Sequence, residues 1–449
     1  MSLTVETRGI AHARLQSPSP EPPFRTQALE EWIWVDVESG RLAYRQSLEY
    51  PDFTFRERIY VDGERGARVT PWTDGPVSLP QESLGTHRAV HRRVPNVVLE
   101  VARERAASLR WVGSEEIDGR GYELVSFAED DGTLLTLYLD VASGLLARIE
   151  RLYSDPVAGD AVATLSFQDY GEVDGIPFPR RVVARRAGVV AEEQELRLAG
   201  IDEGPPEDWP GEIPPPDLAA DRAASDTVVR LGEDVHLLRG VAGPGYNVLV
   251  VAFDAYVLAI ETPLSSDASA AVVARIQEMF PFRPIRYAVP THHHDDHASG
   301  ARAFVAAGAT IVTTPGNQDF FRRMVRAERT IEPDALARNP VLSGIEVIEG
   351  GKRVFRDDNQ LVEIYDVGPN PHAEEHLIAY LPGEKLVFQG DLVVFLDSGP
   401  VEPARPQGVV FARRLEELGL DMERIAGVHG RVGTMAKLRG AVAAAAESP

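Results

Sequence analysis

Six consecutive residues, His292-His293-His294-Asp295-Asp296-His297, place four imidazoles and two carboxylates in one short stretch. These groups are ligands that zinc and similar metals prefer, and a continuous cluster lowers the entropy cost of assembling a site. The chain has only 11 histidines, so four of them in one stretch is a strong concentration. The stretch follows an apolar, strand-like segment at residues 285–289, and we therefore expect a metal-binding loop rather than a solvated polar loop.

Three later segments carry further residues of the same type. They are GPNPHAEEHLIAYLP with His372 and His376, KLVFQGDLV with Asp391, and IAGVHGRVG with His429. Within the first stretch, four of the six residues satisfy the pattern His-x-His-x-Asp-His. This pattern and the order of the later segments resemble the metallo-β-lactamase superfamily, over about residues 226–435.

The resemblance implies a ligand set residue by residue. The first metal would be held by His292, His294 and His372. The second would be held by Asp296, His297 and His429, with Asp391 bridging both metals. The implied cofactor is a pair of zinc ions, with iron or manganese as alternatives. Asp296 and Asp391 are the expected proton-transferring groups.

The residues beside these ligands are expected to support them. His293 and Asp295 alternate with ligands, so they should point away and form outer hydrogen bonds. Glu261 follows an expected strand, where the family often has a buried aspartate; a supporting role and a simple strand-end carboxylate are both open. His376 could replace His372 as ligand, but its spacing to Tyr380 differs from the one that the family resemblance implies, so His376 is expected to line the site and touch substrate.

The reaction implied by the resemblance is hydrolysis by a metal-bound hydroxide, with an ester, lactone, thioester or phosphodiester as substrate. Common zinc β-lactamases have cysteine and lysine where this chain has Asp391 and Val394, so efficient antibiotic hydrolysis is not expected. A lid over an apolar substrate is one interpretation of residues 318–342. Its candidate substrate-binding side chains, which could equally be core, are Phe320, Phe321 and Met324.

Two alternative functions remain open. Iron in the same fold supports sulfur dioxygenation of thiols in some relatives. A lipid-binding or other apolar-ligand-binding protein would instead work through its N-terminal half. Metal content discriminates between the two, because only the first needs a filled C-terminal site.

The chain divides at a proline-rich, acidic linker at residues 204–225, because proline disrupts both helices and central strands. Residues 1–203 are β-rich, with Asp-Gly turns at 118–119, 131–132 and 174–175. Residues 121–183, which include YGEVDGIPFPRRV, resemble the LolA-like lipoprotein-carrier fold. We therefore predict a mainly antiparallel β half-barrel with one helix, at residues 86–105, which Pro95 must kink or end.

Residues 226–449 alternate short apolar strands with helical patterns. The expected strands are 248–252, 256–260 and 285–289, and the expected helix is 267–279. With the resemblance, this alternation predicts an αββα metallo-β-lactamase sandwich. The chain is thus expected to be an α+β protein of two domains.

Composition narrows the classes of partner. The net charge of −23, from 69 acidic and 46 basic residues, disfavours binding to nucleic acid. No stretch is apolar enough to span a membrane. The expected partner is a small-molecule substrate, with an apolar one as an option, and the oligomeric state is open. The compartment is also open: periplasmic or secreted if a signal peptide has been removed, and otherwise cytoplasmic.

Overall fold

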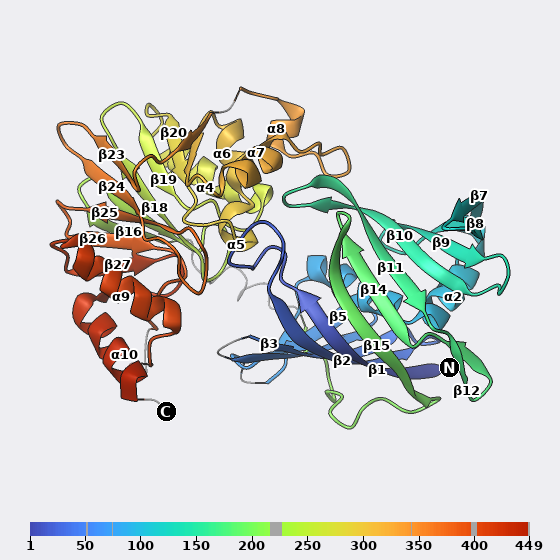
Figure 1. Ribbon diagram of the computed structural model, residues 1–449. Coiled ribbons are helices and arrows are strands. Elements are labelled where there is room, and N and C mark those ends of the chain that lie inside the picture. Colours follow the sequence, from blue (N-terminus) through green and yellow to red (C-terminus); the bar gives the residue numbers. More distant parts are fainter. Residues whose placement is uncertain (51–52, 74, 216–226, 343, 397–401, 448–449) are drawn as a thin grey trace. The chain divides into compact units, whose positions relative to one another are not determined.

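The computed structural model describes residues 1–449 except 51–52, 74, 216–226, 343, 397–401 and 448–449 (Figure 1). The chain forms two compact units. The first contains Met1–Ala13, Thr26–Tyr153 and Ala161–Leu218, and the second contains Arg14–Arg25, Ser154–Asp160 and Ala219–Pro449. Two short segments of the predicted domain 1–203 thus group with the C-terminal unit. Of the predicted linker 204–225, residues 216–225 lie outside the described part.

The first unit is built on an antiparallel sheet of 13 strands in the order β6-β5-β4-β3-β2-β1-β15-β14-β11-β10-β9-β8-β7. The strands are β1 (Ser2–His12), β2 (Thr26–Asp36), β3 (Arg41–Glu49), β4 (Thr54–Asp62), β5 (Arg65–Val69), β6 (Val77–Ser78), β7 (Arg110–Ile117), β8 (Arg120–Ala128), β9 (Leu134–Asp140), β10 (Leu146–Asp155), β11 (Gly159–Gln168), β14 (Arg181–Arg186) and β15 (Val189–Ile201). A separate hairpin joins β12 (Gly171–Val173) to β13 (Ile176–Phe178). The prediction of a mainly antiparallel β domain is therefore confirmed.

Local sequence explains these strands and turns. In the first part of β2, Leu29 is buried between the exposed Ala28 and Glu30, which is the period-two pattern of a strand with one buried face. Asp118-Gly119 joins β7 to β8 with φ angles of 52° and 76°. Two positive φ values are what a tight two-residue hairpin turn requires, and Asp-Gly adopts them at little cost.

The helix predicted at residues 86–105 is divided as Pro95 dictates. The segments are α1 (Leu84–Arg88), the 3₁₀ turns η1 (Gln81–Ser83), η2 (Ala89–Arg93) and η3 (Ala106–Ser108), and α2 (Pro95–Glu104). Pro95 is the first residue of α2, where its missing N–H costs nothing. Val97 and Val98 of α2 pack into the apolar core of the sheet with Phe127 and Ile149. The protein's own side chains therefore fill this face of the sheet.

The second unit contains two sheets. The seven strands of the first sheet, adjacent in chain order, are β16 (Thr227–Gly232), β17 (Val235–Arg239), β18 (Asn247–Ala252), β19 (Val257–Ile260), β20 (Ile285–Val289), β21 (Thr310–Thr313) and β22 (Ile345–Val347). The six strands of the second sheet, also adjacent in chain order, are β23 (Lys352–Arg356), β24 (Leu361–Asp366), β25 (Leu377–Leu381), β26 (Leu386–Gln389), β27 (Arg424–Gly427) and β28 (Gly433–Thr434).

Helices cover the outer faces of both sheets (Figure 1). They are α4 (Ser266–Met279), α5 (Asp295–Ala298), α6 (Ala301–Ala306), α7 (Gln318–Arg326), α8 (Ala335–Arg338), α9 (Pro406–Leu418) and α10 (Met435–Glu447). Alternate strand residues serve different layers: Leu249 packs between the two sheets, whereas Val250 packs against the helices. In β25, Ala379 faces the other sheet and Ile378 faces α9 and α10. These layers make the predicted αββα sandwich.

The loops that carry the predicted ligands meet because of this topology. Strands β19, β20 and β21 are parallel neighbours, and so are β26 and β27. Parallel neighbours end at the same edge of a sheet. In the first sheet, Glu261 follows the end of β19 and the stretch from His292 follows the end of β20. In the second sheet, Asp391 follows the end of β26 and His429 follows the end of β27. His372 comes from the loop between β24 and β25. Among the described residues, no helix is long and apolar enough to cross a membrane.

Candidate metal centre

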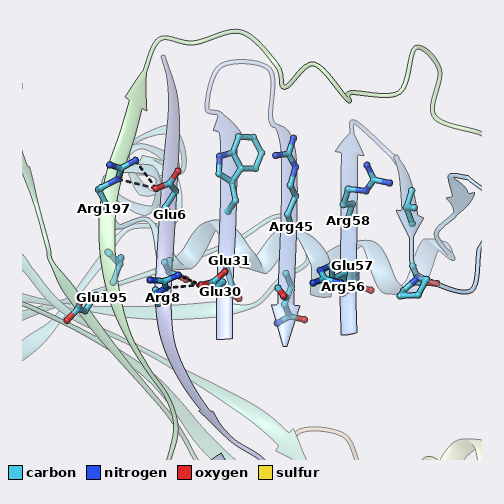
Figure 2. Close-up of a pocket in the computed structure, with 18 residues that line it drawn as sticks. Glu6, Arg8, Glu30, Glu31, Arg45, Arg56, Glu57, Arg58, Glu195 and Arg197 are labelled. Atoms are coloured by element: carbon cyan, nitrogen blue, oxygen red, sulfur yellow. Dashed lines mark hydrogen bonds and ion pairs between the residues drawn. The ribbon is translucent and has the colours of Figure 1, made fainter. Parts of the chain in front are cut away.

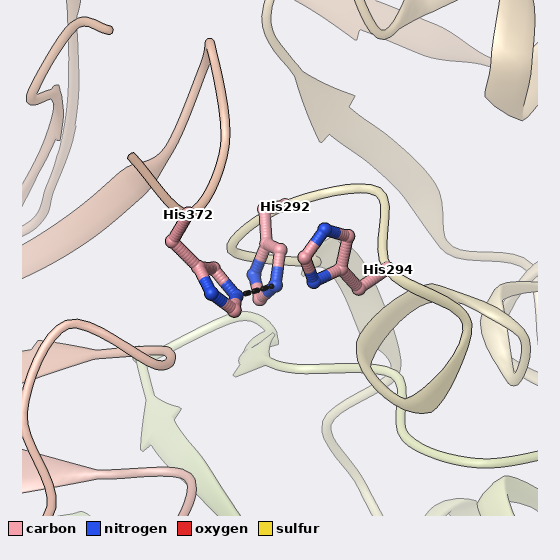
Figure 3. Close-up of side chains that lie close together, drawn as sticks. All are labelled: His292, His294 and His372. Atoms are coloured by element: carbon pink, nitrogen blue, oxygen red, sulfur yellow. Dashed lines mark hydrogen bonds between the residues drawn. The ribbon is translucent and has the colours of Figure 1, made fainter. Parts of the chain in front are cut away.

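His292, His294 and His372 form the first group of ligand-type side chains (Figure 3). The Nε2 atoms of His292 and His372 lie 3.0 Å apart. The ring centroid of His294 lies 4.5 Å from that of His292 and 4.4 Å from that of His372. Residues from two loops, 80 positions apart in sequence, thus bring three imidazoles to one point.

Asp296, His297, Asp391 and His429 form the second group. The Nε2 atom of His297 lies 3.3 Å from a carboxylate oxygen of Asp296 and 3.3 Å from Oδ2 of Asp391. The Nε2 atom of His429 lies 3.3 Å from Oδ1 of Asp391. Oδ2 of Asp391 also lies 3.5 Å from Nε2 of His372. Asp391 therefore joins the second group to the first.

Outer contacts, two hydrogen bonds and one ion pair, indicate which nitrogen three of the histidines present to the centre. Nδ1 of His292 is 3.0 Å from Oγ1 of Thr291, and Nδ1 of His429 is 2.9 Å from the Gly245 carbonyl oxygen. Nδ1 of His297 lies 3.3 Å from Oε2 of Glu261. In all three cases Nε2 remains for the centre. Metal-binding histidines in proteins are held in this way through their other nitrogen.

The charge states also suit a cation. Burial, reinforced by neighbouring imidazoles, holds the pKa of His292 and of His294 well below the usual range, so both rings are neutral near pH 7. Burial alone would raise the pKa of Asp391, but His297 beside it outweighs burial and holds that pKa well below its usual range. Neutral imidazoles and ionised carboxylates are the forms that bind metals.

The raised pKa of His297 also shows that the site favours positive charge. Burial would lower its pKa, but the carboxylates of Asp391, Asp296 and Glu261 outweigh burial and raise the pKa well above the usual value. A proton on His297 thus balances three surrounding carboxylates. Other buried polar atoms here, including Nδ1 of His294 and Oδ1 of Asp391, have no hydrogen-bond partner among the described residues. These orphaned atoms fit a site built for divalent cations.

The residues predicted to support the ligands lie behind them. Glu261 is fully buried, accepts a hydrogen bond from the Thr291 backbone N–H at 3.2 Å and faces Nδ1 of His297. His293 does not belong to either ligand group; its Nε2 lies 2.9 Å from the Ser17 carbonyl oxygen. Asp295 accepts a hydrogen bond from the Gln16 side-chain amide at 2.6 Å.

The four side chains predicted to bind substrate, His376, Phe320, Phe321 and Met324, are buried. His376 is fully buried and its ring stacks on His292, with centroids 4.6 Å apart, so it cannot touch substrate where it lies. Phe320, Phe321 and Met324 are also buried and belong to the core between α7 and the first sheet. Their helical spacing fits a core face and a lid equally well, and packing against the sheet decides for the core. Burial therefore favours a packing role over a substrate-binding role for these four side chains.

Tyr246, on the loop between β17 and β18, was not identified from sequence. Its hydroxyl donates to Oδ2 of Asp296 at 3.2 Å, and its ring lies edge-on against His429 with centroids 4.7 Å apart. Burial and the nearby Asp296 carboxylate raise its pKa, so the hydroxyl stays protonated. A single tyrosine on a glycine-rich loop carries no recognisable motif, so tertiary contact alone reveals it.

Gly390, which precedes Asp391, is required by close packing behind His292. A Cβ atom at this position would lie 2.5 Å from Oγ1 of Thr291 and 2.8 Å from Nε2 of His376. Both neighbours contact His292, so Gly390→Ala is expected to lower the free energy of unfolding by about 1–3 kcal/mol and to weaken metal binding. Denaturant titration and metal titration measure the two effects. Gly383→Ala, where a Cβ meets nothing within 4 Å, is the control and should change neither.

A hollow of about 1000 Å³ lies on one face of the N-terminal sheet (Figure 2). Arginine and glutamate side chains dominate its lining, and several pair with each other. Examples are Arg197 with Glu6 at 2.8 Å and Arg8 with Glu30 at 2.8 Å. Paired, solvated charges do not attract an apolar ligand, so this hollow does not favour the alternative of a lipid-binding protein.

Comparison with known proteins concerns the second unit. The family model described as "Metallo-beta-lactamase superfamily" matches residues 279–429. A metallo-beta-lactamase from Pontibacter korlensis is 19% identical over 49% of this chain and 99% of its own, with a TM-score of 0.38. The DIM-1 metallo-beta-lactamase is 20% identical over 50% of this chain and 98% of its own, with a TM-score of 0.37. A mutant of the sec-alkyl sulfatase PisA1 is 15% identical over 47% and 40%, with a TM-score of 0.34.

Proposed function

We propose that the C-terminal domain, whose residues 279–429 match the model of the metallo-beta-lactamase superfamily, is a hydrolase that uses two divalent metals. One observation carries the proposal: seven ligand-type side chains form two groups, and Asp391 of the second group lies 3.5 Å from His372 of the first. A single carboxylate facing both groups is the arrangement that a two-metal hydrolytic site needs.

The proposed assignment follows the two groups. His292, His294 and His372 would hold the first metal. Asp296, His297 and His429 would hold the second, and Asp391 would serve both. The outer contacts of Thr291, Gly245 and Glu261 support this assignment, because each leaves the nitrogen that faces the centre free to bind. Zinc suits these imidazole and carboxylate ligands, although iron and manganese accept them too.

The residues of the chain have distinct proposed roles. When bound, a pair of divalent cations supplies Lewis acidity and a hydrolytic nucleophile near neutral pH. Asp296 and Asp391, both ionised, accept and move the proton released at the centre. The protonated Tyr246 hydroxyl donates to Asp296 and is placed to donate to a substrate oxygen instead. No serine or cysteine nucleophile is required.

We propose an ester, lactone, thioester or phosphodiester as the substrate class. The residue three positions after Asp391 is Val394, which is half exposed. An uncharged side chain here offers no anchor for the carboxylate of a β-lactam drug. This feature supports a substrate other than a β-lactam antibiotic.

Metal content is the decisive test of the proposal. Protein purified without added metal is expected to contain about two metal ions per chain, most of them zinc, measured by elemental mass spectrometry. Removal by a strong chelator should abolish hydrolysis of ester, lactone, thioester and phosphodiester probes, and zinc should restore it. Iron as the resident metal would shift the proposal to thiol oxidation. A chain that holds no metal, even after reconstitution, would refute it.

A further inference from the structure

The segment Arg14–Arg25, here called the strap, connects β1 to β2 of the N-terminal sheet but groups with the C-terminal unit. It contacts both loops that carry the first metal's ligands. The Leu15 carbonyl accepts from the backbone N–H of Asp295 at 3.3 Å, and the Pro18 carbonyl accepts from that of Glu374 at 2.8 Å. The strap therefore ties the His292 loop to the His372 loop.

Gln16 is the side chain of the strap that reaches the ligands. Its amide nitrogen donates to Oδ1 of Asp295 at 2.6 Å and to Oδ1 of Asp296 at 2.9 Å. The other oxygen of Asp296, Oδ2, faces His297 at 3.3 Å and His429 at 3.9 Å. The Gln16 amide thus holds one oxygen of Asp296 and leaves the other to point into the second group.

The backbone of Ser17 acts on His294 in the same way. Its carbonyl oxygen lies 2.9 Å from Nε2 of His294 and 2.9 Å from Nε2 of His293. A carbonyl only accepts hydrogen bonds, so Nε2 of His294 carries the hydrogen and Nδ1 keeps its lone pair. That Nδ1 atom is buried, and no residue in the described part of the chain forms a hydrogen bond with it. Ser17 itself is 1% exposed, and its Oγ accepts from the Arg25 backbone N–H, which pins the turn.

We infer that the strap is part of the metal centre and that Gln16 is a positioning residue for the metal ligand Asp296. This inference rests on the proposed function and deepens it. The hydrolase domain would then be incomplete without a segment encoded about 280 residues before its signature stretch. Partners of this kind typically contribute 10–100-fold to metal affinity or activity.

The test is metal affinity in Gln16→Leu, which removes the amide donor at nearly constant volume. Zinc affinity is measured by competition with a chromophoric chelator, and the melting temperature is measured on metal-free protein. We expect the affinity for one of the two zinc ions to fall about 10–100-fold, with little change in the metal-free melting temperature. Gln16→Met, which keeps the length of the side chain, replaces this variant if it does not fold.

Glu21→Gln is the matched control on the same strap. Glu21 pairs with the exposed Arg323 and contacts neither ligand group, so zinc affinity should be unchanged. If wild type binds two zinc ions and Gln16→Leu binds both as tightly, the inference about the strap is wrong and the proposed function stands. If wild type binds no metal, the proposed function itself falls. If Gln16→Leu lowers the melting temperature of the metal-free protein as well as its zinc affinity, the role of Gln16 is purely structural and the inference is overturned.

Discussion

Asp391→Ala is expected to lose at least one metal and more than about 100-fold of hydrolytic activity, which exceeds the usual effect of removing an outer partner alone. Its two oxygens face His297, His372 and His429 at 3.3–3.5 Å, so its removal breaks both groups at once. Elemental analysis and initial rates on a responsive substrate measure the two losses. His294→Ala is expected to act in the same direction, with loss confined to the first group.

The control for this experiment is Asp234→Ala. Asp234 also pairs with a basic side chain, Arg283 at 2.7 Å, but belongs to neither ligand group. Its loss should leave metal content and rates unchanged. The N-terminal domain should remain folded in Asp391→Ala and in His294→Ala, as judged by protection from proteolysis. Full activity in either ligand variant would contradict the assignment of the centre.

The candidate ligand residues, which the structure brings together, could be identified from sequence because they lie in short stretches of histidine and aspartate. Four of the seven lie within six positions, and the others stand in motifs that follow strands. The supporting contacts could not be found in this way. Gln16 and Ser17 lie about 280 positions from the residues they hold, and Ser17 acts through its carbonyl, which every residue possesses. No side-chain pattern marks such a contact.

In the fold too, local elements could be predicted from the sequence, whereas pairings between distant strands could not. The strand predicted at 285–289 and the helix predicted at 267–279 agree with β20 and α4, because local periodicity defines both. The order of the 13-stranded sheet, in which β1 pairs with β15, joins residues nearly 200 positions apart. Only packing of the whole sheet settles that pairing. The resemblance of this domain to the LolA-like fold therefore stays a prediction.

The burial of His376 and of Phe320 also depends on residues distant in sequence. A histidine near a ligand motif and a phenylalanine on an amphipathic helix each fit two environments. His376 stacks on His292, and Phe320 packs into the core beneath α7. The choice depends on which surface the next layer covers, and that layer comes from elsewhere in the chain.

Asp334→Ala is expected to lower the free energy of unfolding of the C-terminal unit by about 3–5 kcal/mol, because it leaves the buried charge of Arg302 without its carboxylate partner. Its partner Arg302 is 2% exposed. Arg302 donates to both oxygens of Asp334, at 2.6 and 3.0 Å, and also to the backbone carbonyls of Met324, Val325 and Ala327. One arginine thus holds the end of α7 and the following loop, and Asp334 balances its charge.

The pH dependence of this effect has a definite sign. Burial would raise the pKa of Asp334, but hydrogen bonds from Arg302 and the Ala337 backbone outweigh burial and lower it from 3.8 to about 2. A carboxyl group with a lower pKa in the folded state stabilises the fold above its ordinary pKa, and this contribution is lost as the pH falls through the folded value. The difference in free energy of unfolding between wild type and Asp334→Ala, measured by urea titration, should thus be full at pH 7 and shrink between about pH 4 and pH 2.

The control is Asp319→Ala, which removes a similar but exposed partner, that of Arg322. It should cost less than about 1 kcal/mol at any pH. A loss for Asp334→Ala that is equally small, or that does not change with pH, would show that the buried pair does not stabilise this unit.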